Sequence, residues 1–159
     1  LNQMYNTLII VKPALVLSFN FLEASAKDIT ITINDFDLRI DKIKNKYFLI
    51  RHDIFSPGNS VSTNFDTYSD SLKAISSELI ANRNEIFKKI FDQDLEKNHL
   101  DKISKIKLKS ELLNNCISVL LYINNYYNTT NKHTLTTFGD YEAKIKRLVT
   151  FEKLFYEIK

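Results

Sequence analysis

The chain has 159 residues, of which 44% are hydrophobic and 26% are charged, and its net charge is +3 at neutral pH. This length predicts one domain with a sizeable core, and the composition excludes a wholly disordered chain. A single cysteine, Cys116, excludes an internal disulfide, and its apolar helical surroundings predict a buried thiol. The two glycines are far apart, which excludes the glycine-rich phosphate loops of nucleotide-dependent enzymes.

Residue usage indicates an A+T-rich genome, because isoleucine occurs 19 times, asparagine 16 times, and lysine 18 times against 4 arginines. Organelles, some intracellular bacteria and some phages have such genomes. The apolar residues 7–22 contain Lys12, Pro13 and Asn20 and are shorter than a membrane span. We therefore expect no membrane contact. The A+T-rich residue usage leads us to expect an organelle-encoded protein of the mitochondrial matrix. The alternative location is the bacterial cytoplasm.

The first elements in chain order are a strand and a helix. Residues 8–11 form a short β-branched run that is typical of a strand. Pro13 suits the first turn of a helix, and residues 14–27 carry apolar side chains at helical spacing. A strand over residues 14–21 is the alternative.

The next stretch has the period of two that is typical of half-buried strands. Isoleucines alternate with threonines over residues 29–33, and the apolar alternation continues over residues 36–40. The basic residues 42–46 are then expected to form a hairpin tip, and residues 47–54 the returning strand. The sequence Ser-Pro-Gly-Asn-Ser at residues 56–60 is the strongest turn signal in the chain.

The second half changes to helical spacing. Apolar residues predict an amphipathic helix that ends near residue 91, a further helix over 113–127 and a last one over 141–158. Residues 103–108 fit either a short edge strand or the start of a helix, and residues 128–137 are expected to form a loop. The whole pattern predicts an α+β fold.

Catalytic and metal-binding patterns are absent from the sequence. Glu96 and His99 match one Glu-x-x-His motif of a di-iron site, but the second such motif is missing from the sequence. A solvated turn is therefore the preferred interpretation. Residues 92–96 resemble the start of a calcium loop, but Lys97 stands where glycine is required. No serine or cysteine has the surroundings of a nucleophile. We expect no enzyme, no metal, no cofactor and no small-molecule substrate.

The expected hairpin carries basic residues next to aromatic ones. Lysines on an extended hairpin reach phosphates that a compact body does not reach. A solvated hairpin in a lysine-rich protein is the alternative. The candidate RNA-binding residues are Arg39, Lys42, Lys44, Lys46, Arg51 and His52.

The order of elements resembles the small-subunit ribosomal protein ten (S-ten) family over roughly residues 6–90. Residues 36–42, Phe-Asp-Leu-Arg-Ile-Asp-Lys, lie where the family has Gly-Pro-Ile-Pro-Leu-Pro-Thr, and here the prolines and the glycine are missing. Residues 44–50, Lys-Asn-Lys-Tyr-Phe-Leu-Ile, resemble the basic run and strand that follow. Phe65-Asp66 resembles the family's aromatic-acid pair.

This resemblance implies a divergent organellar version of the family. Its fold would be ferredoxin-like, with a small mixed sheet, two packed helices and the long basic hairpin in residues 1–109. Residues 110–159 would be a helical extension. The implied function is structural, in the head of the small ribosomal subunit, with ribosomal RNA and neighbouring ribosomal proteins as partners. The alternative is a non-enzymatic protein-binding adapter or an accessory subunit of a respiratory, secretion or phage complex.

Overall fold

The computed structural model describes residues 12–56, 65–91, 93–128 and 135–159. Within these ranges the chain forms four helices and contains no strand. The helices are α2 (Lys12–Phe55), α3 (Phe65–Ile90), α4 (Lys97–Asn128) and α5 (Leu135–Glu157).

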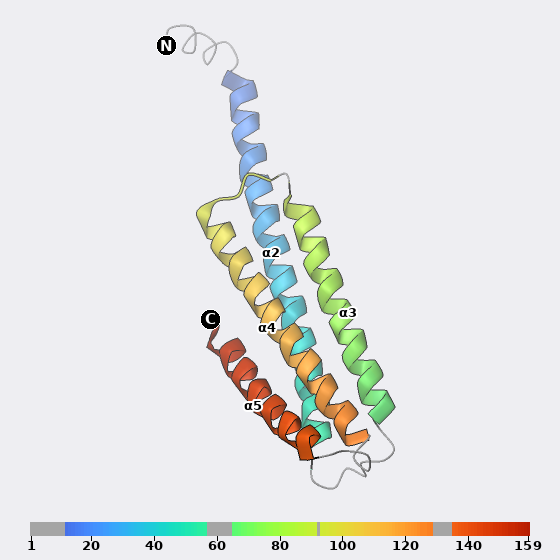
Figure 1. Cartoon of the computed structure of the whole chain (residues 1–159). Coiled ribbons are helices and arrows are strands. Elements are labelled where there is room, and N and C mark those ends of the chain that lie inside the picture. Colours follow the sequence, from blue (N-terminus) through green and yellow to red (C-terminus); the bar gives the residue numbers. More distant parts are fainter. Residues whose placement is uncertain (1–11, 57–64, 92, 129–134) are drawn as a thin grey trace.

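The helices form a bundle in which each one runs opposite to the helix before it (Figure 1). α4 is the central helix, because it packs against α2, α3 and α5. α2 and α4 therefore lie side by side and run in the same direction. α5 packs against the C-terminal half of α4 and contacts the end of α2. This up-and-down order is common in bundles whose successive helices are neighbours.

The helical conformation of α2 follows from the spacing of its buried side chains. They recur every three or four residues, as a helix that packs on one face requires. Ile31 and Leu38 lie on the opposite side of the helix and are 65% and 60% exposed. The buried residues of α2 are Ile29, Ile33, Phe36, Ile40, Ile43 and Tyr47.

The predicted α+β fold, a mixed sheet with a long basic hairpin, is wrong, because the described residues form helices only. The predicted strands at residues 29–33, 36–40 and 47–54 all lie within α2. Ile29 and Ile33 fit both the strand period and the helix period, and the structure buries these two while Ile31 stays exposed.

Two physical effects explain why residues 12–55 form a helix and not strands. An isoleucine is less favourable than alanine in a helix by less than about 0.7 kcal/mol, whereas burial of its side chain contributes about 1.5–3 kcal/mol. The sequence between Pro13 and Pro57 also contains neither proline nor glycine, so no residue there ends the helix.

The helical predictions are confirmed. Residues 14–27 are part of α2, and the helices expected near residue 91 and over 113–127 and 141–158 correspond to α3, α4 and α5. Residues 103–108, for which strand and helix were both open, belong to α4. The expected boundary after residue 109 falls inside α4, where Ser110 is buried. The predicted strand at 8–11 and the turn residues 57–60 lie outside the described residues.

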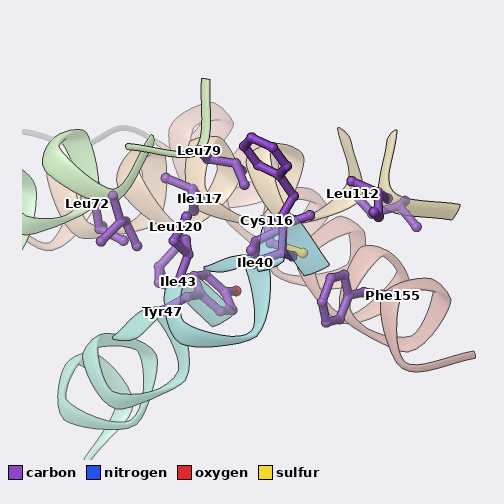
Figure 2. Packing of buried hydrophobic residues seen from close by; sticks show 14 of the residues in the cluster. Ile40, Ile43, Tyr47, Leu72, Leu79, Leu112, Cys116, Ile117, Leu120 and Phe155 are labelled. Atoms are coloured by element: carbon purple, nitrogen blue, oxygen red, sulfur yellow. The ribbon is translucent and has the colours of Figure 1, made fainter. Parts of the chain in front are cut away.

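The core joins side chains from all of the described helices (Figure 2). Tyr47 of α2 and Cys116 of α4 lie in its interior, and Phe155 covers them from α5. The labelled core residues are Ile40, Ile43 and Tyr47 of α2, Leu72 and Leu79 of α3, Leu112, Cys116, Ile117 and Leu120 of α4, and Phe155 of α5.

Candidate functional site

The candidate RNA-binding residues all lie on α2, where the structure distributes them around the helix instead of placing them at a hairpin tip. Arg39 points to α3, and its guanidinium is 2.9 Å from the Glu85 carboxylate and 2.7 Å from that of Asp35. Lys46 lies two turns further along α2 and contacts Glu78, which lies two turns earlier on α3, at 3.1 Å. These two contacts link α2 to α3 in one antiparallel register.

The remaining candidates have different surroundings. Lys44 lies 3.6 Å from Asp41 on the same helix. Arg51 points toward α5, where its Nε lies 2.6 Å from a carboxylate oxygen of Glu152. Lys42 and His52 are exposed. Four of the six predicted residues thus already face carboxylates, which reduces the positive charge that they offer to phosphates.

The ion pairs of α2 also affect the protonation of their members. Burial alone would lower the pKa of Arg39, but the carboxylates of Glu85 and Asp35 outweigh it and raise that pKa. Hydrogen bonds from Arg39 and Lys89 lower the pKa of Glu85. The cations and carboxylates at this seam therefore stay charged together at neutral pH.

The contact between α2 and α5 contains the most deeply buried charge among the described residues. The Glu152 side chain is 9% exposed and that of Arg51 is 33% exposed. Burial raises the pKa of Glu152, and the Arg51 guanidinium opposes this rise. In the core beside them, burial raises the pKa of the Cys116 thiol to about 12 and also raises that of Tyr47. Both groups stay protonated, so Cys116 is not activated as a nucleophile.

The Glu96–His99 pair forms a structural contact at the start of α4. His99 is buried, although the sequence suggested a solvated turn. Its Nδ1 accepts a hydrogen bond from the Glu96 backbone N–H at 3.4 Å, and its Nε2 lies 3.1 Å from the Thr30 hydroxyl. Because Nδ1 accepts, Nε2 carries the proton and donates to Thr30. His99 thus caps α4 and attaches it to α2.

Metal-ligand clusters and membrane-spanning segments are both absent from the described part of the chain. No group of three or more His, Cys, Asp or Glu side chains is arranged there to hold a metal ion. None of the helices has an apolar stretch of the length and hydropathy needed to cross a bilayer, within the residues that the structure describes.

A groove runs along the surface between α3 and α4, and both apolar and polar side chains line it. A hollow of about 290 Å³ lies there between Ile80 and Arg83 of α3 and Glu111 of α4. A smaller hollow follows it along the groove and is lined by Arg83, Phe87 and Lys107. The groove is therefore open to solvent along two stretches and has apolar side chains on its α3 wall.

The exposed hydrophobic side chains on this wall lie on one line of α3. Ile80 and Phe87 are seven residues apart, which places them on one helical face, and Phe91 follows directly after Ile90, the last residue of α3. They are 49%, 39% and 83% exposed. Leu100, 49% exposed, lies on α4 at a helical position that faces the same side as Lys107. We call these four residues the α3–α4 face.

A second line of exposed hydrophobic residues lies on the back of α2. Ile31, Leu38 and Leu49 share one helical face, but the side chains of Lys42 and Asn45 separate Leu38 from Leu49. Scattered exposed hydrophobic residues of this kind are normal in proteins. The α3–α4 face differs because Phe87 lines a hollow of the groove together with Lys107, and the more exposed Phe91 follows four residues later.

Sequence reasoning missed the α3–α4 face. It used Leu72, Ile75, Leu79, Ile86 and Ile90 to predict the helix, and all five are buried. The line Ile80–Phe87–Phe91 was a readable signal, because it forms a second apolar stripe on a helix that already had a complete first one.

Comparisons with known proteins supply no further constraint. A scan against protein-family models, a search of curated proteins and a search of solved structures each found no match.

Proposed function

We propose that this chain is a non-enzymatic, protein-binding helical module, an adapter or accessory subunit of a larger complex, and that the α3–α4 face is its binding surface. The observation that carries the proposal is the exposure of Ile80, Phe87 and Phe91, of which Ile80 lines the hollow of about 290 Å³ and Phe87 the smaller hollow of the same groove. Adjoining large apolar side chains in water carry a free-energy cost that a partner removes.

The arrangement of polar groups supports binding over catalysis. Cys116 is buried and protonated, and His99 is committed to a helix cap. The cations of α2 that would serve an RNA-binding role face carboxylates of α3 and α5. A role in the small ribosomal subunit remains a prediction from the sequence, to which this charge pairing adds no support.

Site-specific photo-crosslinking tests the proposal. A photoreactive phenylalanine analogue replaces Phe91, which is 83% exposed, and in a control it replaces Leu49, which is 69% exposed on the back of α2. Both variants are mixed with nuclease-treated extract of the source cells and irradiated. We expect a discrete protein adduct at position 91 and none at position 49.

Three results would contradict the proposal. They are no adduct at position 91, equal adducts at both positions, and an adduct at position 91 that contains nucleic acid instead of protein. Far-UV circular dichroism of both variants, compared with the unmodified chain, establishes that the bundle is intact before the comparison is made.

A further inference from the structure

The cations around the α3–α4 face indicate the charge of its partner. Lys107 and Arg83 line the groove, and Glu111 is the acidic residue among the side chains that line its hollows. Lys73 lies two turns before Ile80 on the same line of α3, and Lys88 follows Phe87 directly. By the same criterion Asp101, which follows Leu100 directly, also belongs to the rim, which thus has four cations and two carboxylates.

These rim lysines differ from the cations of α2 in their surroundings. Within the described residues, no carboxylate lies in ion-pair distance of Lys73, Lys88 or Lys107, whereas Arg39 and Lys46 each contact a carboxylate of α3. Arg83 is 3.9 Å from Glu111, a loose contact between half-exposed groups. The rim therefore keeps a net positive charge that favours an acidic partner.

The secondary structure of the groove indicates the shape of the partner. α3 and α4 satisfy their backbone groups internally, so they offer no strand edge to which an extended peptide could add. Ile80, Phe87 and Phe91 extend over about 16 Å along the helix axis. A helix with apolar residues at spacings of three, four and seven places its side chains along such a straight groove.

The same chain shows this mode of packing on the other side of α4. α5 lies there with Leu148 and Phe155, seven residues apart, buried against α2 and α4. The two sides of α4 differ in one respect. The α5 side is covered by a helix of the chain itself, whereas no helix among the described residues covers the α3–α4 face.

Resting on the proposed function, we infer that the partner segment is an acidic amphipathic helix of another protein. Its apolar stripe covers Ile80, Phe87 and Phe91, and its flanking carboxylates contact Lys88 and Lys107 across the rim. Apolar contact supplies most of the affinity, and the lysines select the charge of the partner.

Two synthetic helical peptides test this inference. They share one leucine stripe at helical spacing, and one peptide carries glutamates on its flanks where the other carries lysines. Binding of the fluorescein-labelled peptides to the full chain is measured by fluorescence anisotropy at low and high salt. We expect the acidic peptide to bind more tightly by at least roughly tenfold, and this preference to weaken at high salt.

Matched variants assign the two contributions. Phe87→Asp should abolish binding of the acidic peptide, whereas Leu49→Asp on the back of α2 should leave it unchanged. Replacing both Lys88 and Lys107 with glutamate should lower the affinity for the acidic peptide by about tenfold and raise the affinity for the basic peptide. Lys42→Glu, at another exposed lysine, should have no effect.

The possible failures separate this inference from the proposed function. Equal binding of both peptides, or binding of neither, overturns the inference that the partner is an acidic helix. The crosslinked adduct at position 91 still tests the proposed function independently. Two further results also overturn it. One is a dimer of this chain in sedimentation that Phe87→Asp dissolves, and the other is binding of a single-stranded RNA that Phe87→Asp does not affect.

Discussion

The ion pair between α2 and α5 yields the most specific prediction on stability. Arg51→Met should destabilise the fold more than Glu152→Gln, because the two side chains differ in exposure, at 33% and 9%. The arginine variant leaves a carboxylate buried without its cation, which costs about 3 kcal/mol. The glutamine variant leaves a guanidinium that water partly reaches, at a cost of about 1–2 kcal/mol.

The pH dependence separates this charge effect from lost packing. Burial raises the pKa of Glu152 above its ordinary 4.5, so the folded state holds the proton more tightly than the unfolded chain does. Stability from this group therefore falls as pH rises through the window between the ordinary and the raised pKa. Removing Arg51 raises the pKa of Glu152 further, so the charge penalty of Arg51→Met should be largest at neutral pH, shrink as pH falls through the raised pKa of Glu152, and be absent by pH 4.5.

Urea unfolding followed by far-UV circular dichroism measures both effects. Arg51 also lies over the Phe55 ring at 5.3 Å, and the loss of this contact does not depend on pH in the acidic range. The double variant Arg51→Met/Glu152→Leu is the control and should unfold within about 1 kcal/mol of the parent chain. Equal penalties for the two single variants at neutral pH, or an Arg51→Met penalty that is as large in acid as at neutral pH, would refute the reasoning.

Four further substitutions test other parts of the fold by chemical and thermal denaturation. Ile40→Ala should cost about 2–5 kcal/mol, whereas Leu38→Ala should cost less than about 0.5 kcal/mol, and the reverse order would contradict the helical register of α2. Asn82→Leu should stabilise by about 1 kcal/mol, because the buried Asn82 Oδ1 lacks a hydrogen-bond partner among the described residues, and a lower melting temperature would disprove this. His99→Ala should cost about 1–2 kcal/mol through the loss of the α4 cap, and an unchanged stability would contradict that function.

Most of the second half of the chain could be predicted from the sequence because, outside residues 103–108, its apolar residues fit only one period. Leu72, Ile75 and Leu79 have no alternating partners that would suggest a strand, and all three are buried as a helix requires. The same applies to Leu113 and Ile117 of α4. Where the helix period stands alone in the sequence, the structure has a helix.

The first half was ambiguous because Ile29 and Ile33 fit both periods, whereas Ile31 fits the strand period alone. Five residues do not distinguish them, and the resemblance to a strand-rich family favoured the strand. Over a longer window the two periods diverge, since Phe36 and Ile40 continue the helix spacing of Ile33 without a break. The helix period was therefore present in the sequence, but at a length greater than that of a single strand.

The candidate binding residues could not be assigned from the sequence for a different reason. A cluster of basic residues shows where cations lie along the chain, but not where their counter-charges lie. The carboxylates that contact Lys46 and Arg51 are 32 and 101 residues away. Only the packing of α3 and α5 against α2 brings them together, so local charge density overstated what α2 offers to a ligand.

The distribution of ion pairs links the fold to the proposed binding function. Arg39 and Lys46 lie two turns apart on α2, and their partners Glu85 and Glu78 lie two turns apart in the reverse order on α3. A shift of α2 by one turn would break both pairs at once, so these charges favour one antiparallel register over its neighbours. Among the residues that the structure describes, the rim lysines beside Phe87 form no such pairs, and a change of their sign leaves this register intact. Charge on α2 thus specifies the bundle, and charge on the α3–α4 face is available to select a partner.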